Sequence, residues 1–508
     1  MSVTSLPFFC FFALSLAVYY IVPQKFQWFV LLVFSMFFFL NACRPYTIIY
    51  LLCAVVITTF SARGIANALD SGKKDNALRW LVIGITTDVG ILAVLKYSNF
   101  FISNIISVSM GRLHIDLLQL AAPVGISFYT LQLAGYLLDV YWGITEYQPS
   151  FLKTMLFAGY FPQMTSGPIS RYAMLKDTLY SGHKASWQNI TFGLERMLWG
   201  VFKKLVISER AGVIVDTIYG NPDKYDGFYI IVASALFMMQ LYTDFSGCMD
   251  IVIGASECYG IELPENFRTP FFSRTVQEYW QRWHITLGEW LKDYILFTIL
   301  RSEGWRRLTK SIKNRFGKKA AKQIPAYLGM LCVWLLIGLW HGGAWKYILG
   351  MGLWFWVIIV LEQVLAPHSK KLTASLGIDT DAFGWHFFQS LRVFVCVCIG
   401  NMFFRLSSIP ETFYMLKQAA ASWNPEIFFD GSLYKLGLEE KDCRLLLASL
   451  FILLIVSALQ EKESVRILLA KQILPFRWIV LFGLLFLTLI VGIWGPGYDT
   501  QTFIYEAF

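Results

Sequence analysis

The fold of this chain is decided by residues 326–343, AYLGMLCVWLLIGLWHGG. No charged side chain occurs between Ala326 and Trp340, and a membrane-crossing helix needs roughly 20 largely apolar residues. A helix that starts near Ala326 would place His341 about 22 Å along its axis. An ionisable group at that depth is costly and usually lines a cavity or pathway. Gly342 and Gly343 can end the helix and leave room beside the ring.

The composition of the whole chain agrees with a membrane protein. Of 508 residues, 56% are hydrophobic and 15% are charged, whereas soluble proteins average about 25% charged residues. A soluble globule, a disordered chain, a coiled coil and collagen are therefore excluded. The net charge of the chain is +9. In a membrane protein an excess of Lys and Arg usually lies in the cytoplasmic loops, so we expect no nucleic-acid partner. The nine cysteines show no zinc or disulfide spacing, so no metal site is predicted.

Ten stretches are apolar enough to form spans, which predicts an all-α polytopic fold. They lie near 5–22, 27–42, 46–62, 79–96, 226–243, 326–341, 344–365, 386–405, 444–460 and 473–494. The first lacks a positively charged leader, so it reads as a span and not as a cleaved signal. Between 98 and 210, apolar pieces at 98–110, 118–142, 151–166 and 190–207 are broken by glycine and proline. We expect re-entrant or interfacial helices there, since broken backbone needs cover at membrane depth.

The short loops predict the orientation. Residues 301–322 carry nine Lys or Arg and one acid, Glu303, so this loop should be cytoplasmic. The basic loops 63–79 and 461–477 should lie on the same side. Both termini and the acid-leaning segment 406–442 then fall on the extracytoplasmic side of the membrane.

His284 is the second histidine in an unusual setting. As one helix, residues 266–295 would be amphipathic and interfacial. One face would hold Trp280, Trp283, Leu287, Trp290 and Tyr294, and another would hold Glu278, Arg282, Glu289 and Asp293. His284 follows Trp280 by one turn and can face inward. For His284 and His341 alike, a hydrogen-bonded core residue remains the alternative.

Other catalytic patterns are missing from the sequence. There is no convincing G-x-S-x-G elbow, Walker loop, dinucleotide fingerprint or HExxH helix. Two histidines cannot hold zinc without further ligands. Acid–base work by histidine on a membrane-held substrate is the chemistry that remains.

Four ordered motifs carry a family resemblance. They are PVGISFYTLQLAGYLLDVY (123–141), FPQMTSGPISRY (161–172), QLYTDFSGCMDIVIG (240–254), and GIELPENFRTPFFSRTVQEYWQRWHITLGEWLKDY (260–294) with GLWHGGAWKYILGMGLW (338–354). Together, over about 120–365, they closely resemble the membrane-bound O-acyltransferase (MBOAT) family. Within it they resemble the bacterial branch that modifies cell-surface polymers by alginate-type or peptidoglycan O-acetylation.

The resemblance implies a fold and a set of site residues. The fold would be a ring of helices around a thin centre crossed by a tunnel, formed by one membrane domain over 1–494. The catalytic His falls on His341 and the second characteristic His on His284. Supporting or tunnel positions would be Asp244, Ser246, Trp283 and Trp340. The alternative for Asp244 and Ser246 is to cap a broken helix. For Arg171 the alternatives are a phosphate contact and snorkelling to the interface.

The resemblance also implies substrates and partners. No cofactor is expected to be bound; acetyl-CoA or an acyl-carrier protein would donate the acyl group as a thioester at the cytoplasmic face. An SGNH-type enzyme outside the cytoplasmic membrane would pass it to the polymer. The basic loop 301–322 would dock an acidic carrier, bind anionic lipid or act only as a topology signal.

The C-terminal tail, 495–508, follows a Gly-Pro-Gly break and ends TFIYEAF. Interfacial anchoring explains such aromatics. The sharper hypothesis is that Tyr505 meets His341 and relays the acyl group, because the tail resembles the tyrosine motif of a small peptide that accompanies D-alanyl transfer proteins.

Two other functions stay open. A D-alanyl transferase for teichoic acid would differ by its dependence on a carrier-protein thioester. A transporter or flippase without chemistry of its own would use the membrane histidines as a proton relay.

Overall fold

The computed structural model describes residues 2–110 and 112–494, and this part of the chain is helical, with one isolated β-bridge between Phe267 and Trp283. Nine of its helical stretches are long and apolar enough to cross a membrane. They are Gln24–Ala42 (α2), Pro45–Asp70 (a 3₁₀ turn and α3), Lys74–Val108 (α4), Phe228–Cys258 (α11), Glu303–Trp340 (α15), Lys346–Ser375 (η5 and α16), Phe383–Arg405 (α17), Glu440–Gln460 (α19) and Leu474–Val491 (α21). A shorter apolar helix, α1, covers Leu6–Ile21.

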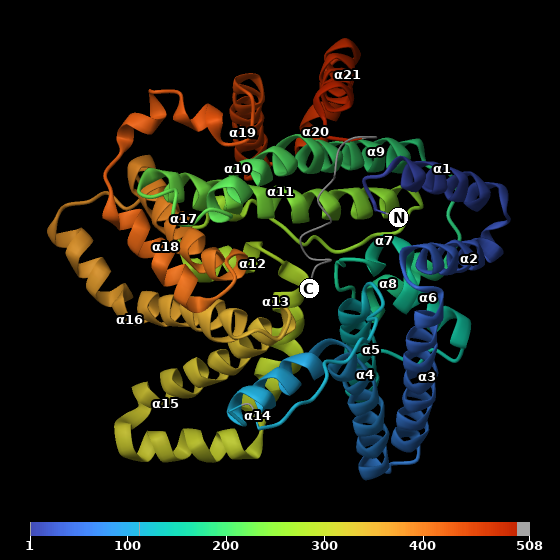
Figure 1. Cartoon of the computed structure of the whole chain (residues 1–508). Helices are drawn as coiled ribbons and strands as arrows, with labels where there is room; N and C mark the ends of the chain where they lie inside the picture. The colour runs from blue at the N-terminus through green and yellow to red at the C-terminus, as the bar shows by residue number, and fades with distance from the viewer. Residues whose placement is uncertain (1, 111, 495–508) are drawn as a thin grey trace. The chain divides into compact units, whose positions relative to one another are not determined.

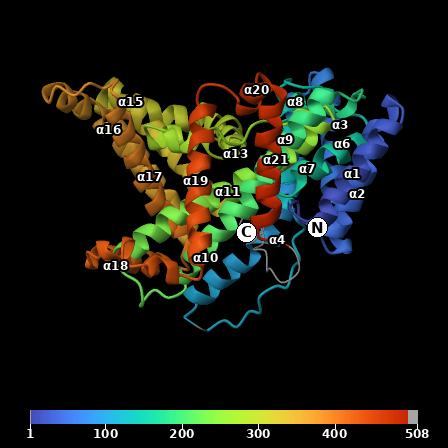
Figure 2. The same cartoon turned by 90° about the horizontal axis from the view of Figure 1, so that it is seen from above.

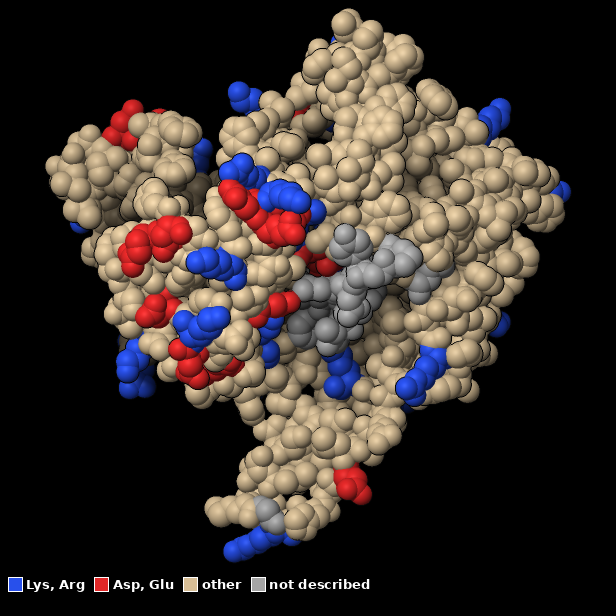
Figure 3. Space-filling view, turned by 45° about the horizontal axis from the view of Figure 1, so that its top comes forward, with Lys and Arg blue, Asp and Glu red and all other residues tan. Residues whose placement is uncertain are grey.

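Each predicted span overlaps one of these helices, so the all-α polytopic membrane fold is confirmed. The surface fits the same environment. On the face seen in Figure 3, charged side chains stand in groups and much of the rest carries none. Exposed apolar side chains such as Phe60, Phe387 and Phe451 lie on three of the candidate spans.

Backbone contacts divide the chain into two compact units. Unit 1 contains residues 2–201 and 248–265 of the described chain, and unit 2 contains 202–247 and 266–494. Helix α11 contributes Phe228–Gly247 to unit 2 and Cys248–Cys258 to unit 1. Every candidate site residue that the structure describes, apart from Arg171, belongs to unit 2.

Unit 1 shows which part of the irregular region was predicted well. The piece 98–110 is not separate, because α4 continues without a break from Lys74 to Val108. None of the remaining helices of this region is a candidate span by length and composition together. They are Ile126–Tyr141 (α5), Phe151–Gly159 (α6), Phe161–Met164 (α7), Tyr172–Tyr180 (α8) and Trp187–Phe202 (α9). Nearly all of α5 is buried against α3, α4, α6 and α8, so α5 lies in the core of the unit.

Helix α9 is locked to α11 inside unit 1. A Cβ on Gly254 would lie 2.5 Å from the carbonyl oxygen of Gly193, so the two backbones meet directly. One turn further along, Arg196 donates to Asp250 at 2.9 Å and to both oxygens of Glu265 at 2.7 and 2.6 Å. Small residues permit close helix contact in membranes, and the bidentate pair fixes its geometry.

Unit 2 consists of long helices joined by short, irregular ones. The long helices α15, α16 and α17 are neighbours in Figures 1 and 2 and pack around the π-helical turn η5, Lys346–Gly352. The shorter elements are Lys203–Ser208 (η2, π-helical), Glu209–Tyr219 (α10), Val276–Arg282 (α12), Ile285–Trp290 (α13), Leu291–Leu296 (η4, π-helical), Phe297–Arg301 (α14), Ile409–Ala421 (α18) and Val465–Ala470 (α20).

Candidate functional site

His341 lies at the C-terminal end of α15. The helix ends at Trp340, and Gly342 and Gly343 follow with φ of 131° and 63°, a region that glycine enters without strain. The predicted helix start near Ala326 is wrong. Regular helix begins after Gly317 (φ 85°, ψ 177°) and includes Pro325, because the intervening residues are mostly strong helix formers.

The His341 ring sits in an aromatic nest. It is 5% exposed, meets Phe404 edge-on at 5.3 Å between centroids and lies 6.3 Å from Tyr347. A Cβ on Gly338 would lie 2.5 Å from the carbonyl oxygen of Tyr347, so α15 touches η5 at its backbone. Lys346 Nζ donates to the carbonyls of Phe404 and Leu406 at 3.3 and 2.7 Å. The end of α17 is thereby held beside the imidazole.

His284 breaks the helix that the sequence predicts over 266–295. Helix α12 ends at Arg282, His284 adopts a left-handed conformation with φ of 46°, and α13 starts at Ile285. The cause is Asn266, whose Oδ1 accepts from the Thr286 N–H at 3.2 Å and from Thr286 Oγ1 at 3.0 Å. Ile285 N–H also donates to the Asn266 carbonyl at 3.0 Å. These bonds cap α13 from outside its own sequence.

Asn266 also fixes the His284 imidazole. Nδ1 lies 3.1 Å from Asn266 Oδ1, and that oxygen can only accept, so Nδ1 carries the hydrogen and donates. Nε2 is then the basic nitrogen of the neutral ring. The ring is 4% exposed and packs edge-on against Phe245 at 4.9 Å. His284 lies outside the nine candidate spans, and burial lowers its pKa from 6.5 to about 3.

The aromatic face predicted around His284 is buried and not interfacial. Trp283 is 3% exposed, stacks on Tyr279 at 5.6 Å and meets Phe267 at 5.0 Å. Trp280 packs on Trp334 and Phe355 at 5.0 and 4.7 Å. Trp340 is half-buried as the last residue of α15. Trp283 therefore contributes packing beside His284.

Asp244 and Ser246 lie within α11, which is helical through both positions, so the helix-capping alternative does not apply. Asp244 Oδ1 pairs with Lys204 Nζ at 2.6 Å, and Lys204 also pairs with Glu209 at 2.8 Å. Lys203 Nζ donates to Ser246 Oγ at 2.8 Å. All five side chains are at most 4% exposed. Sequence reasoning missed both lysines, although an adjacent pair inside VFKKLVIS (201–208) was a visible signal.

One turn of α11 links this buried charge cluster to His284. Asp244 and Ser246 face the two lysines, and Phe245 between them packs on the imidazole. Elsewhere on α11, Phe237 lies 6.5 Å from Phe404, the ring that packs on His341. Phe237 and Phe245 are eight residues apart, about 12 Å along the helix. His284 therefore packs on α11 directly, whereas His341 is separated from this helix by Phe404.

Three π-helical turns occur in the described chain, all in unit 2, and each adjoins a candidate position. The turn η2 carries Lys203 and Lys204, η4 follows α13 after His284, and η5 follows His341. Such turns occur frequently at functional sites. Of the remaining candidates, Arg171 directly precedes α8 in unit 1, and Tyr505 lies outside the described residues.

Comparison with known proteins defines the class. Residues 145–404, just over half of the chain, match the membrane-bound O-acyltransferase family, MBOAT. The chain belongs to this family and is a membrane O-acyltransferase. Both histidines and the charge cluster lie inside the matched region.

Three relatives narrow the comparison. A probable alginate O-acetylase, AlgI, of Pseudomonas syringae pv. tomato is 29% identical over 79% of this chain and 71% of the relative. The peptidoglycan O-acetyltransferase of Helicobacter pylori is 27% identical over 66% of this chain and 64% of the relative. The teichoic acid D-alanyltransferase of Bacillus subtilis is 28% identical over 50% of this chain and 62% of the relative.

Removing the shared cation of the charge cluster should destabilise the protein strongly. Lys204→Met leaves the carboxylates of Asp244 and Glu209 buried without their shared counter-ion, which lowers the free energy of unfolding by about 3–5 kcal/mol. Asp244→Asn should cost less, because the Lys204–Glu209 pair survives. Thermal unfolding of the detergent-solubilised variants tests the order. Equal loss in both variants would show that Lys204 is not the shared counter-ion.

His284 should make the folded state acid-sensitive. Below pH 6.5 the unfolded chain binds a proton at this ring that the folded chain excludes until about pH 3, so stability falls as pH drops through that window. Between pH 7.5 and 4.5 the loss from this group is roughly 2–3 kcal/mol. His284→Gln should therefore lose less stability than wild type over the same interval. Parallel pH dependences would contradict a buried neutral His284.

Proposed function

We propose that this membrane O-acyltransferase moves an acetyl group from a cytoplasmic thioester across the cytoplasmic membrane for O-acetylation of a cell-surface polysaccharide or peptidoglycan. The observation that carries the proposal is the buried His341 imidazole, held by backbone contacts at a glycine-terminated helix end inside the family-matched region. The relatives named for O-acetylation cover more of this chain than the relative named for D-alanyl transfer, which supports acetyl as the group.

In the proposed reaction His341 is the general base. An acceptor hydroxyl attacks the thioester carbonyl carbon, its proton passes to the neutral imidazole, and the carbon–sulfur bond breaks. The imidazolium then returns the proton to the departing thiolate, so the products are an ester and a thiol. Aromatic walls such as Phe404 and Tyr347 keep water from the activated acyl group.

His284 would serve the donor side. With Nδ1–H donated to Asn266, its Nε2 can accept a hydrogen bond and so position the acyl donor or the group that carries the proton. Because the ring stays neutral at working pH, this role needs no change of charge. Asn266 is a positioning residue in this account, since it fixes the tautomer and the left-handed backbone of His284.

The proposed partners remain an acyl-CoA or acyl-carrier protein on one side and an SGNH-type acyltransferase on the other. The first half of α15, Glu303–Phe316, exposes most of the basic side chains of the predicted cytoplasmic loop. An exposed basic helix suits an acidic carrier protein. Tyr505 keeps its place as a proposed acyl relay.

Loss of the His341 imidazole should abolish transfer while leaving the protein folded. Alkali-released acetate from envelope polymer is measured in cells that carry wild type, His341→Ala or, as a control, His368→Ala. His368 is an exposed histidine on α16. His341→Ala should fall by about 10²–10⁴-fold and His368→Ala should stay at the wild-type level.

The same assay separates the rival functions. Full acetylation by His341→Ala would refute the assignment of the base. Envelope D-alanine that depends on a carrier protein, with no change in acetate, would favour the D-alanyl transferase. If neither acyl group depends on His341 although the protein still moves an acylated solute, the transporter class is favoured.

A further inference from the structure

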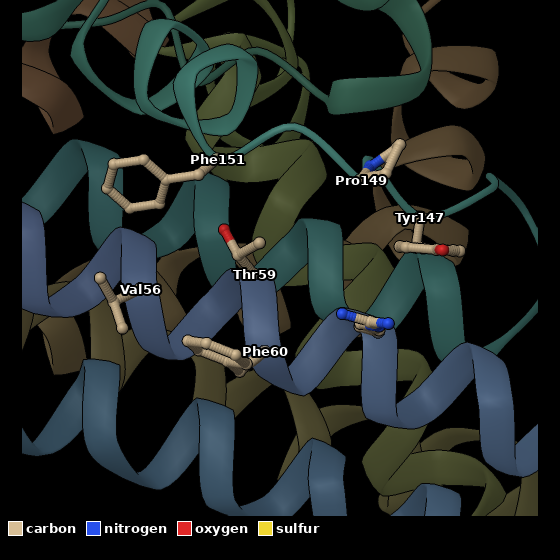
Figure 4. A pocket seen from close by; sticks show the side chains of 7 residues that line it. Val56, Thr59, Phe60, Tyr147, Pro149 and Phe151 are labelled. Atoms are coloured by element: carbon tan, nitrogen blue, oxygen red, sulfur yellow. The ribbon is translucent and has the colours of Figure 1, made fainter.

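A cavity of about 610 Å³ lies in unit 1, lined by none of the residues assigned to acyl transfer. Its walls are four residues of α3 and three of the chain that leads into α6 (Figure 4). The α3 residues are Val56, Thr59, Phe60 and Arg63, and the others are Tyr147, Pro149 and Phe151. This volume falls within the range of roughly 300–1,000 Å³ that small-molecule sites occupy.

The α3 wall of the cavity is one stripe of a candidate membrane span. Its four residues are spaced i, i+3, i+4 and i+7, so they share one helix face. Val56 is 37% exposed and Phe60 is 63% exposed, although α3 belongs to the span Pro45–Asp70. Apolar side chains exposed on such a helix face hydrocarbon, so the α3 wall of the cavity suits an acyl chain.

The guanidinium of Arg63 lies at one end of this apolar α3 wall. Arg63 follows Val56 by seven residues, about 10 Å along the helix, and is exposed. Within residues 2–110 and 112–494, no hydrogen bond or ion pair reaches its guanidinium, nor does any hydrogen bond reach the Tyr147 hydroxyl. A guanidinium and a phenol offer donors in the geometry that phosphate oxygens accept.

The wall opposite α3 is rigid. Gln148 faces inward, where its N–H donates to the Tyr136 hydroxyl at 2.6 Å and its Nε2 donates to Tyr172 at 2.9 Å. Its Oε1 accepts from Ser150 N–H at 3.0 Å. Its neighbours Tyr147 and Pro149 line the cavity instead. The segment that carries Tyr147 is thus fixed before any ligand arrives.

We propose that this cavity binds an anionic phospholipid. Its phosphate is held by Arg63 and Tyr147, and one acyl chain lies over Val56, Phe60 and Phe151. The basic pattern of Arg63, Lys73, Lys74 and Arg79 places this end of α3 in the cytoplasmic leaflet, where anionic headgroups attract arginine. A zwitterionic lipid binds less well because its ammonium offsets the phosphate charge. The site does not depend on the proposed acetyl transfer.

The test uses the full-length protein in detergent and native mass spectrometry, with phosphatidylglycerol and phosphatidylcholine as the two probes. Wild type should retain one phosphatidylglycerol more tightly than phosphatidylcholine. Arg63→Gln should lower the affinity for phosphatidylglycerol about tenfold and reduce the preference between the lipids. Arg79→Gln is the matched control, because it removes an exposed arginine from the neighbouring helix α4 and should change neither value.

A second variant tests the apolar end without touching the cation. Thr59→Phe fills the cavity from α3 and should weaken phosphatidylglycerol binding while the melting temperature stays within a few degrees of wild type. Unchanged affinity in Arg63→Gln and Thr59→Phe would overturn the proposal. Equal losses in Arg63→Gln and Arg79→Gln would overturn it too, because attraction would then be diffuse. If wild type does not prefer phosphatidylglycerol, the cavity belongs to another occupant and the proposal is wrong.

Discussion

The ammonium of Lys204, shared between Asp244 and Glu209 in the interior of unit 2, is the interaction on which the rest of this unit depends. Charges without water must be paired, so the π-turn η2 and helix α11 cannot shift against each other without breaking the pairs. Because Phe245 follows Asp244 directly, the same constraint fixes the aromatic ring on which His284 packs. The ion pairs of Lys204 therefore also fix the position of the aromatic ring beside His284.

Much of this architecture follows from patterns local to the sequence. Uninterrupted apolar runs predict the long helices, because lipid permits few backbone structures other than helix. The end of α15 at His341 follows in the same way from Gly342 and Gly343. The orientation across the membrane rests on loop charge alone and stays a prediction.

The features that sequence reasoning missed depend on partners far away in the chain. The sequence predicts one helix over 266–295, yet hydrogen bonds of Asn266 break it at His284, 18 residues further along the chain. Lys203 and Lys204 look like unfavourable members of an apolar helix until their partners on α11 are known. In both cases tertiary hydrogen bonds override local propensity, and a single sequence does not state which residues will meet.

The proposal of transfer across a membrane rests on two buried histidines, His341 at the end of α15 and His284 directly before α13. The measurement that tests this most directly uses purified protein in sealed vesicles of known orientation, with labelled acetyl-CoA on one side and an acceptor sugar on the other. The account predicts labelled acceptor only when the thioester contacts the face that carries the exposed basic first half of α15, Glu303–Phe316. Equal labelling from either face, or label that crosses as free acetate before any ester forms, would contradict it.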